Sequence, residues 1–254
     1  MAKTIRALGF YGVYLFVGTI AAAEPQAGTF PKEVIRVGSD TREYRLVVPA
    51  TVNLANPAPL VVAFPGSVID SKDLMPLYTE LNTTAEKHKF IVAYPNPLGR
   101  SWALSVQKAV ADLAFFDALV LKVSSSYQID SQRIYVVGMS NGGYFAHIVG
   151  KERSQTVAAA ACHSGALGLQ TLPGINAERK FPVLIAHGDQ DRIIPVGVAR
   201  QNRDKYLAEG HAVKYVELEG VGHMWGTKFD INETLWQFFA DHPLPGAGTK
   251  RKRP

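Results

Sequence analysis

Ser140 stands among glycines in a setting where its hydroxyl could act as a nucleophile. The stretch GMSNG, residues 138–142, follows the apolar run RIYVVG and precedes a segment with helical character. Such a tight strand-to-helix turn exposes a serine Oγ, and the residues two positions away must lack side chains to avoid collision. The helix behind the serine directs backbone N–H groups toward charge that develops at an attacked carbonyl. An Asn-Gly hairpin is the alternative, but the following YFAHIVGKE does not alternate as a strand would, so we predict Ser140 as a nucleophile.

A serine hydroxyl needs a base to accept its proton and a carboxylate to orient that base. Asp189 and Asp191 follow the apolar run VLIAHG, and His223 follows the run VELEG, between a glycine and the pair Met224-Trp225. The order Ser, Asp, His along the chain is that of α/β-hydrolases. Each candidate follows a predicted strand, at the edge where open parallel sheets hold their active sites. The residues alone therefore predict His223 as the base and either aspartate as its partner.

The elements that must position these residues alternate between extended and helical segments. A hairpin over 33–50, turning near residues 38–40, opens the mature chain. Short apolar strands, of the kind buried on both faces, follow, with one late strand nearer the C-terminus. The predicted strands cover residues 59–64, 90–95, 133–138, 157–162, 182–188 and 213–220.

Helical candidates separate these strands. They cover residues 72–88, 107–126, a segment from Asn141, 197–209 and 233–242. In 107–126 apolar residues recur at helical spacing, while Asp112 and two other charged residues occupy other faces. This alternation predicts an α/β fold with a mostly parallel central sheet and helices on both faces, in a single domain over residues 24–242.

The two ends of the chain differ in composition from its body. Lys3 and Arg6 precede the apolar stretch 7–20, and three alanines follow it, which is typical of a signal peptide over residues 1–23. An uncleaved anchor is the alternative, but a spanning helix needs about 20 apolar residues. We therefore expect a secreted or periplasmic protein without stable membrane insertion after cleavage. Residues 243–254 end in KRKRP and are predicted to form a basic, disordered tail, with tethering to an anionic surface as the alternative.

Composition excludes several classes of function. The net charge of +5 comes from the two ends, because residues 24–249 carry 21 basic and 22 acidic residues. A nucleic-acid partner would require clustered basic residues on the folded part, and none is expected. Cys162 is the only cysteine, so no intramolecular disulfide can form and a buried thiol is predicted. Neither metal-ligand spacing nor a phosphate-binding glycine motif occurs, so no metal and no cofactor are expected.

Three motifs in order carry a family resemblance. The stretches DSQRIYVVGMSNGGYFAH, HGDQDRIIP and GVGHMWG together resemble secreted esterases of the polyhydroxybutyrate depolymerase and feruloyl esterase group, within the α/β-hydrolases. The resemblance also touches PLVVAFPGS and FFDALVLKVSSSYQID. The family pattern H-G-x-x-D-x-x-[VI]-P matches from His187 to Pro195 and implies Asp191 as the catalytic acid. Asp189 is then a loop or capping residue.

The main departure from the family concerns the oxyanion hole. Family members carry His-Gly after the first central strand, where this chain has FPGS at residues 64–67. Proline has no N–H, so Pro65 cannot donate there. The resemblance implies the backbone N–H groups of Asn141 and Ser67 as the oxyanion donors.

Two tryptophans are candidates for shaping the substrate pocket. Trp102 lies in GRSWALS, and Trp225 follows His223 by two residues. The alternative is that both fill space at the mouth of the core. Together these features predict a secreted serine esterase that cleaves a polyhydroxyalkanoate oligomer, a feruloyl or acetyl sugar or another small ester through an acyl-enzyme. An acyltransferase or peptidase on the same triad, or an inactive hydrolase-fold binding protein, are the rival hypotheses.

Overall fold

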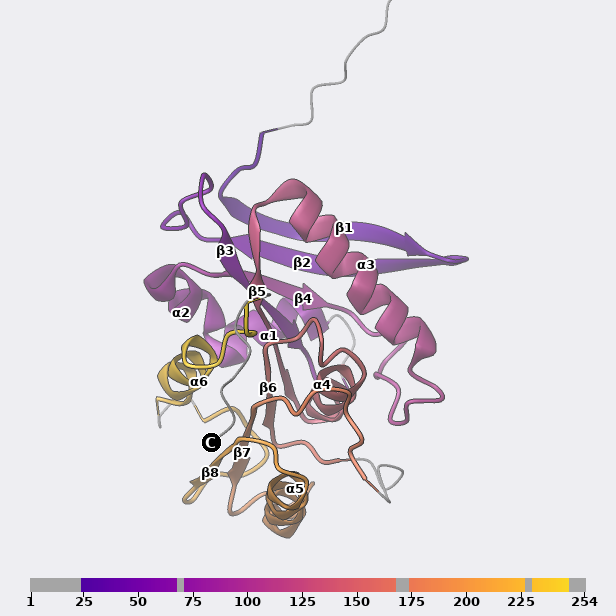
Figure 1. Cartoon of the computed structure of the whole chain (residues 1–254), viewed down its shortest axis with the longest axis vertical. Helices are drawn as coiled ribbons and strands as arrows, with labels where there is room; N and C mark the ends of the chain where they lie inside the picture. The colour runs from indigo at the N-terminus through magenta and orange to yellow at the C-terminus, as the bar shows by residue number, and fades with distance from the viewer. Residues whose placement is uncertain (1–23, 68–70, 168–173, 227–229, 247–254) are drawn as a thin grey trace, which may run out of the picture.

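The computed structural model describes residues 24–67, 71–167, 174–226 and 230–246, which build one twisted sheet flanked by helices (Figure 1). The sheet has eight strands in the order β1-β2-β4-β3-β5-β6-β7-β8. Strand β2 is antiparallel to both of its neighbours, and all other neighbouring pairs are parallel. The strands are β1 (Gly28–Val37), β2 (Asp40–Val48), β3 (Ala58–Phe64), β4 (Ile91–Pro95), β5 (Ile129–Met139), β6 (Ala159–His163), β7 (Val183–Gly188) and β8 (Val213–Leu218). This arrangement confirms the predicted mostly parallel sheet.

The helices cover both faces of the sheet, as expected. They are α1 (Ser71–Thr79), α2 (Leu81–His88), α3 (Val110–Ser126), α4 (Asn141–Glu152), α5 (Val196–Ala208) and α6 (Ile231–Ala240). Helices α3, α4 and α5 pack on one face, and α1, α2 and α6 on the other (Figure 1). A hydrophobic core lies between each group of helices and the sheet. Successive side chains of a strand point to opposite faces, so Leu60, Val62 and Phe64 of β3 pack in the core beneath α3, α4 and α5. Val61 and Ala63 pack in the core beneath α1, α2 and α6.

Two predicted helices differ from the observed ones. The segment 72–88 forms α1 and α2 rather than one helix, because Glu80 adopts a left-handed backbone conformation with φ 56°. In α3 the predicted outward position of Asp112 is wrong: its side chain is buried and pairs with Arg42 on β2, with 2.8 Å between the guanidinium Nη2 and Oδ1. A carboxylate at such a position needs a partner that sequence periodicity does not reveal.

The ends of the chain bear on the remaining expectations. The predicted signal peptide, residues 1–23, lies outside the described residues and stays a prediction. At the other end the Leu244 N–H donates to the Gln132 carbonyl, so packing extends past His242 into the predicted tail. Among the helices that the structure describes, none has the length and apolarity to cross a bilayer.

The single cysteine is buried, as predicted. Burial raises the pKa of the Cys162 thiol to about 12.

Candidate active site

Ser140 lies on the expected turn between β5 and α4. Its backbone has φ 56° and ψ −121°, a region that L residues rarely adopt. The Ser140 N–H donates to the His163 carbonyl at 2.9 Å, which ties the turn to the end of β6. Helix α4 begins at Asn141, so the N–H of Asn141 is among the first helical N–H groups, which lack partners within the helix. The turn thus places a hydroxyl and an available backbone donor side by side.

The glycines around Ser140 are required by close packing rather than by their own dihedral angles. A Cβ on Gly142 would overlap the carbonyl oxygen of Phe64 at the end of β3. A Cβ on Gly138 would overlap the carbonyl oxygen of Gly142. Both obstacles are backbone atoms of packed elements, which cannot swing aside as a flexible side chain could. The elbow therefore sits directly against the loop that follows β3.

This packing predicts a strong effect of a single methyl group. Gly142→Ala is expected to lower the free energy of unfolding by about 3 kcal/mol, because the β3 backbone must move to admit the Cβ. Gly197→Ala is the matched control, since nothing lies within 4 Å of its added Cβ and alanine favours a helix. Urea denaturation of both variants tests this. A Gly142→Ala protein as stable as the wild type would contradict the account of the elbow.

His223 and Asp191 form a hydrogen-bonded pair at the ends of two other strands. His223 Nδ1 lies 2.7 Å from Asp191 Oδ2, and the carboxylate is completely buried. Asp191 Oδ1 accepts the N–H groups of Ile193 and Ile194, each at 2.9 Å. Burial acts to raise the pKa of Asp191, but the hydrogen bonds from Ile194, His223 and Ile193 outweigh it, and the pKa lies below the ordinary value. An ionised Asp191 holds the His223 ring with Nδ1 protonated and leaves Nε2 as the acceptor.

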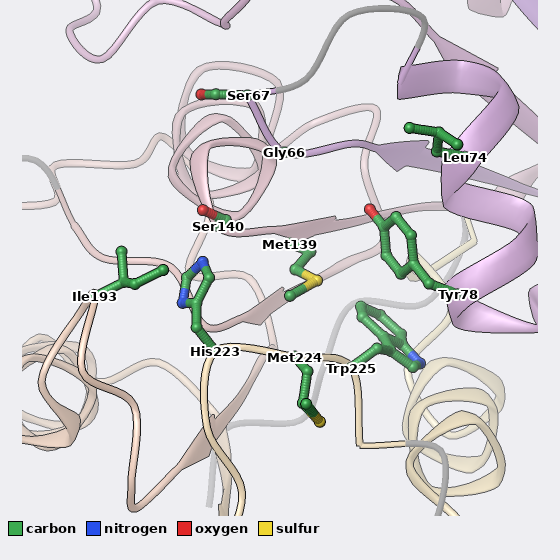
Figure 2. A pocket seen from close by; sticks show the side chains of 10 residues that line it. All are labelled: Gly66, Ser67, Leu74, Tyr78, Met139, Ser140, Ile193, His223, Met224 and Trp225. Atoms are coloured by element: carbon green, nitrogen blue, oxygen red, sulfur yellow. The ribbon is translucent and has the colours of Figure 1, made fainter.

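Figure 2 shows the imidazole of His223 beside the side chain of Ser140, with one ring nitrogen turned toward the hydroxyl. Ser140 and His223 line the same pocket. The structure therefore brings together Ser140, His223 and Asp191, which the sequence scatters over three loops.

Asp189, the other aspartate after β7, has a different environment. Its Oδ1 accepts the N–H of Gly220 at 2.7 Å, which ties the loop after β7 to the loop after β8. It is partly exposed and contacts neither His223 nor Ser140 through any described hydrogen bond. Its geometry is that of a loop-capping residue, whereas Asp191 has the geometry of a partner for the histidine.

The site pocket is apolar and of a size that suits a small molecule. Its volume is about 460 Å³, within the usual range for ligand pockets. It is lined by Gly66, Ser67, Leu74, Tyr78, Met139, Ser140, Ile193, His223, Met224 and Trp225 (Figure 2). None of these residues is an acid, a lysine or an arginine. Leu74, Ile193 and Met224 are well exposed, so the rim of the pocket is also apolar.

The oxyanion residues implied by the family resemblance flank Ser140. Gly66 and Ser67 line the pocket at the end of β3, and a Cβ on Gly66 would stand 3.4 Å from the Ser140 Cβ. The family resemblance implies the N–H of Ser67 as the candidate donor from this loop. Asn141 contributes from the other side, at the start of α4.

The two tryptophans occupy different places. Trp225 lines the pocket, and its Nε1 donates to Asn232 Oδ1 at 2.8 Å. Trp102 does not line this pocket: its side chain is buried and its Nε1 donates to the Pro65 carbonyl at 3.0 Å. Trp102 was expected to contact the substrate, but in the structure it contacts the backbone of the loop after β3 instead.

Three further residues lie near the site, and the sequence predicted no role for any of them. His187, read only as the first letter of a motif, is completely buried with Nε2 2.7 Å from the Ile194 carbonyl and 3.2 Å from Asp191 Oδ2. His163 stacks on Trp225 with ring centroids 4.7 Å apart, and burial lowers its pKa to about 3, so the ring is neutral. Tyr78 lines the pocket from α1, and burial raises its pKa to about 12. The end of a strand was the only available signal for either histidine, and Tyr78 had none.

No group of three or more His, Cys, Asp or Glu side chains that could hold a metal ion occurs in the part of the chain that the structure describes.

The sequence is similar to those of known esterases. A family model described as Phospholipase/Carboxylesterase matches residues 111–231. The chain is 28% identical over 207 residues to feruloyl esterase D of Neurospora crassa, covering 74% of this chain and 69% of the relative. It is 24% identical over 232 residues to the bifunctional acetylxylan esterase/xylanase XynS20E of Neocallimastix patriciarum, covering 78% of this chain and only 33% of that longer protein.

Solved structures share the fold. A thermostable esterase superposes with a TM-score of 0.68 at 22% identity, covering 84% of this chain and 62% of the other. A CE1 ferulic acid esterase from Anaeromyces mucronatus superposes with a TM-score of 0.64 at 16% identity, covering 89% and 93%. At such low identity these structures establish the architecture and leave the substrate open.

Proposed function

We propose that this chain, which has the α/β-hydrolase fold and is similar to carboxylesterases, hydrolyses carboxylic esters through an acyl-enzyme on Ser140. The observation that carries the proposal is the joint placement of Ser140 and His223 on one apolar pocket, with the Asp191 carboxylate 2.7 Å behind the histidine. Each partner has one role that the geometry allows: Ser140 is a strained, half-buried nucleophile, His223 is an oriented base and Asp191 is a buried, ionised carboxylate.

The proposed reaction uses these groups twice. Ser140 Oγ attacks the ester carbonyl while His223 Nε2 accepts its proton, and Asp191 stabilises the imidazolium that forms. The N–H groups of Asn141 and Ser67 donate to the oxyanion. His223 then protonates the leaving alcohol, which departs and leaves the acyl group on Ser140. A water molecule, deprotonated by His223, repeats the attack and releases the acid.

The pocket supports an uncharged substrate. Its wall offers the rings of Tyr78 and Trp225 and the side chain of Met139, and no fixed charge lines it. A charged acyl group would lose its hydration there without gaining a partner. An aromatic or short aliphatic acyl group fits this lining, and the feruloyl and acetyl groups in the names of the relatives are of that kind.

A panel of paired esters tests this proposal. p-Nitrophenyl pentanoate and the p-nitrophenyl monoester of glutaric acid have similar length and differ in a terminal carboxylate. We expect kcat/KM to be at least about 100-fold higher for the neutral ester, since an unpaired charge in the pocket costs several kcal/mol. Acetate through octanoate esters, methyl ferulate and a hydroxybutyrate oligomer complete the panel. A folded protein that hydrolyses none of these esters would overturn the proposed function, and equal rates on the two paired esters would overturn the neutral-substrate part of it.

A further inference from the structure

Trp102 contacts the structures that carry both candidate oxyanion donors. The Trp102 N–H donates to Asn141 Oδ1 at 2.6 Å, and Asn141 Nδ2 donates to the Trp102 carbonyl at 3.2 Å. The indole Nε1 donates to the Pro65 carbonyl at 3.0 Å. All three hydrogen bonds are buried. One residue thus binds the start of α4 and the loop after β3.

The peptide unit between Pro65 and Gly66 is held at its carbonyl, which accepts the indole N–H of Trp102. Because a peptide unit is planar, this hydrogen bond restrains the orientation of the whole unit. That orientation sets the direction in which the chain continues to Ser67. Trp102 therefore restrains this loop, although Pro65 stands where the family that the chain resembles carries a histidine.

Packing and hydrogen bonds hold the Trp102 ring and the backbone beside it in place. Its ring stacks on Phe145 with centroids 4.7 Å apart and meets Phe64 edge-on at 5.3 Å. The next residue, Ala103, donates its N–H to Asp112 Oδ2 at 3.1 Å. The other oxygen of Asp112 pairs with Arg42, whose guanidinium also lies over the Trp102 ring, 6.0 Å from its centroid. A buried ion pair of this kind is weak evidence for stability by itself, but it fixes the backbone beside Trp102.

We propose that Trp102 is the positioning residue of the oxyanion hole, holding the Asn141 and Ser67 donors at one spacing through its indole N–H and its main chain. The inference deepens the proposed esterase function and rests on it. Trp102 touches neither the pocket nor the reacting atoms, so it acts through Pro65 and Asn141. Its removal should weaken binding of the transition state and leave binding of the ground-state ester unchanged.

Trp102→Phe tests this proposal because it removes the Nε1–H and keeps an aromatic ring between Phe64 and Phe145. We expect kcat to fall about 10- to 100-fold, somewhat less than the loss of a whole oxyanion donor, with KM within about threefold of wild type. Affinity for an aryl boronic acid, which forms a tetrahedral adduct on the serine, should fall by a similar factor. Trp236→Phe is the matched control. Trp236 lies in α6, outside the pocket, its ring stacks on Phe90, and kcat should not change.

The outcomes separate the two proposals. A Trp102→Phe enzyme with wild-type kcat and boronate affinity overturns the positioning role and leaves the esterase function intact. Equal rises in KM and losses in kcat would show a general structural role and would also overturn it. Wild-type protein without esterase activity overturns the proposed function itself. Where the phenylalanine variant does not fold, 3-benzothienylalanine at position 102 keeps the ring size, removes only the N–H and is expected to give the same loss in kcat.

Discussion

Ser140→Ala is expected to lower kcat for p-nitrophenyl acetate by about 10⁴-fold or more, because the substitution removes the only atom that attacks the ester in the proposed reaction. The alanine keeps the backbone of the elbow, and the hydrogen bond from the residue 140 N–H to the His163 carbonyl stays in place. The folded state should therefore survive, as judged by circular dichroism and the unfolding midpoint. The measurement is the steady-state rate of p-nitrophenol release.

Ser125→Ala is the matched control for that experiment. Ser125 lies in α3, and its Oγ donates to the Lys122 carbonyl on an exposed surface. It should retain full activity. A Ser140→Ala protein that keeps more than about 1% of the wild-type rate would contradict the nucleophile assignment, because triad variants elsewhere lose far more.

Exchanging the two aspartates after β7 for asparagine should separate their roles. Asp191→Asn is expected to reduce kcat by about 10³- to 10⁴-fold, since a neutral amide cannot stabilise the His223 imidazolium or select its tautomer. An asparagine Oδ1 can still accept the N–H groups of Ile193 and Ile194, so the loop should persist. Asp189→Asn should change kcat by less than about threefold, because an amide oxygen also accepts the N–H of Gly220.

The lowered pKa of Asp191 also predicts that the wild type and Asp191→Asn differ in how their stability changes at acid pH. The folded-state pKa of Asp191 lies below its ordinary value of 3.8. Its ionised form therefore contributes stability at pH values above 3.8, and that contribution is lost as the pH falls through the lowered folded-state pKa. Asp191→Asn should lose less stability than the wild type over this acid range. Steady-state kinetics and unfolding midpoints measured between neutral and acid pH check both expectations, and an inactive Asp189→Asn beside an active Asp191→Asn would reverse the assignment.

The sheet was readable from the sequence because strands buried on both faces appear as short apolar runs. PLVVAF and PVLIAHG each match a strand to within one residue. Helix ends were less accessible. The helical segment breaks at Glu80, where no glycine in the sequence predicts a break. The left-handed backbone of Glu80 depends on how α1 and α2 pack against the sheet.

The catalytic candidates were readable for a different reason. The elbow needs glycines at fixed offsets from Ser140, and the ends of parallel strands meet at one edge, so chain order alone brings Asp191 and His223 close. The contacts that support the site have no comparable pattern in the sequence. Arg42 pairs with Asp112 across 70 positions, and Trp102 reaches Pro65 across 37. Only the packed fold shows that Trp102 lies beneath the oxyanion loop rather than at the pocket.

The central claim is that Ser140 carries the acyl group, and covalent labelling tests it most directly. Diethyl p-nitrophenyl phosphate phosphorylates an activated serine and releases p-nitrophenol, and intact-protein mass spectrometry followed by tryptic mapping locates the adduct. The account predicts one adduct per chain, on the tryptic peptide of residues 134–151 at Ser140, accompanied by complete loss of esterase activity and absent from Ser140→Ala. An adduct on another residue, or an active enzyme that this reagent leaves unlabelled, would contradict it.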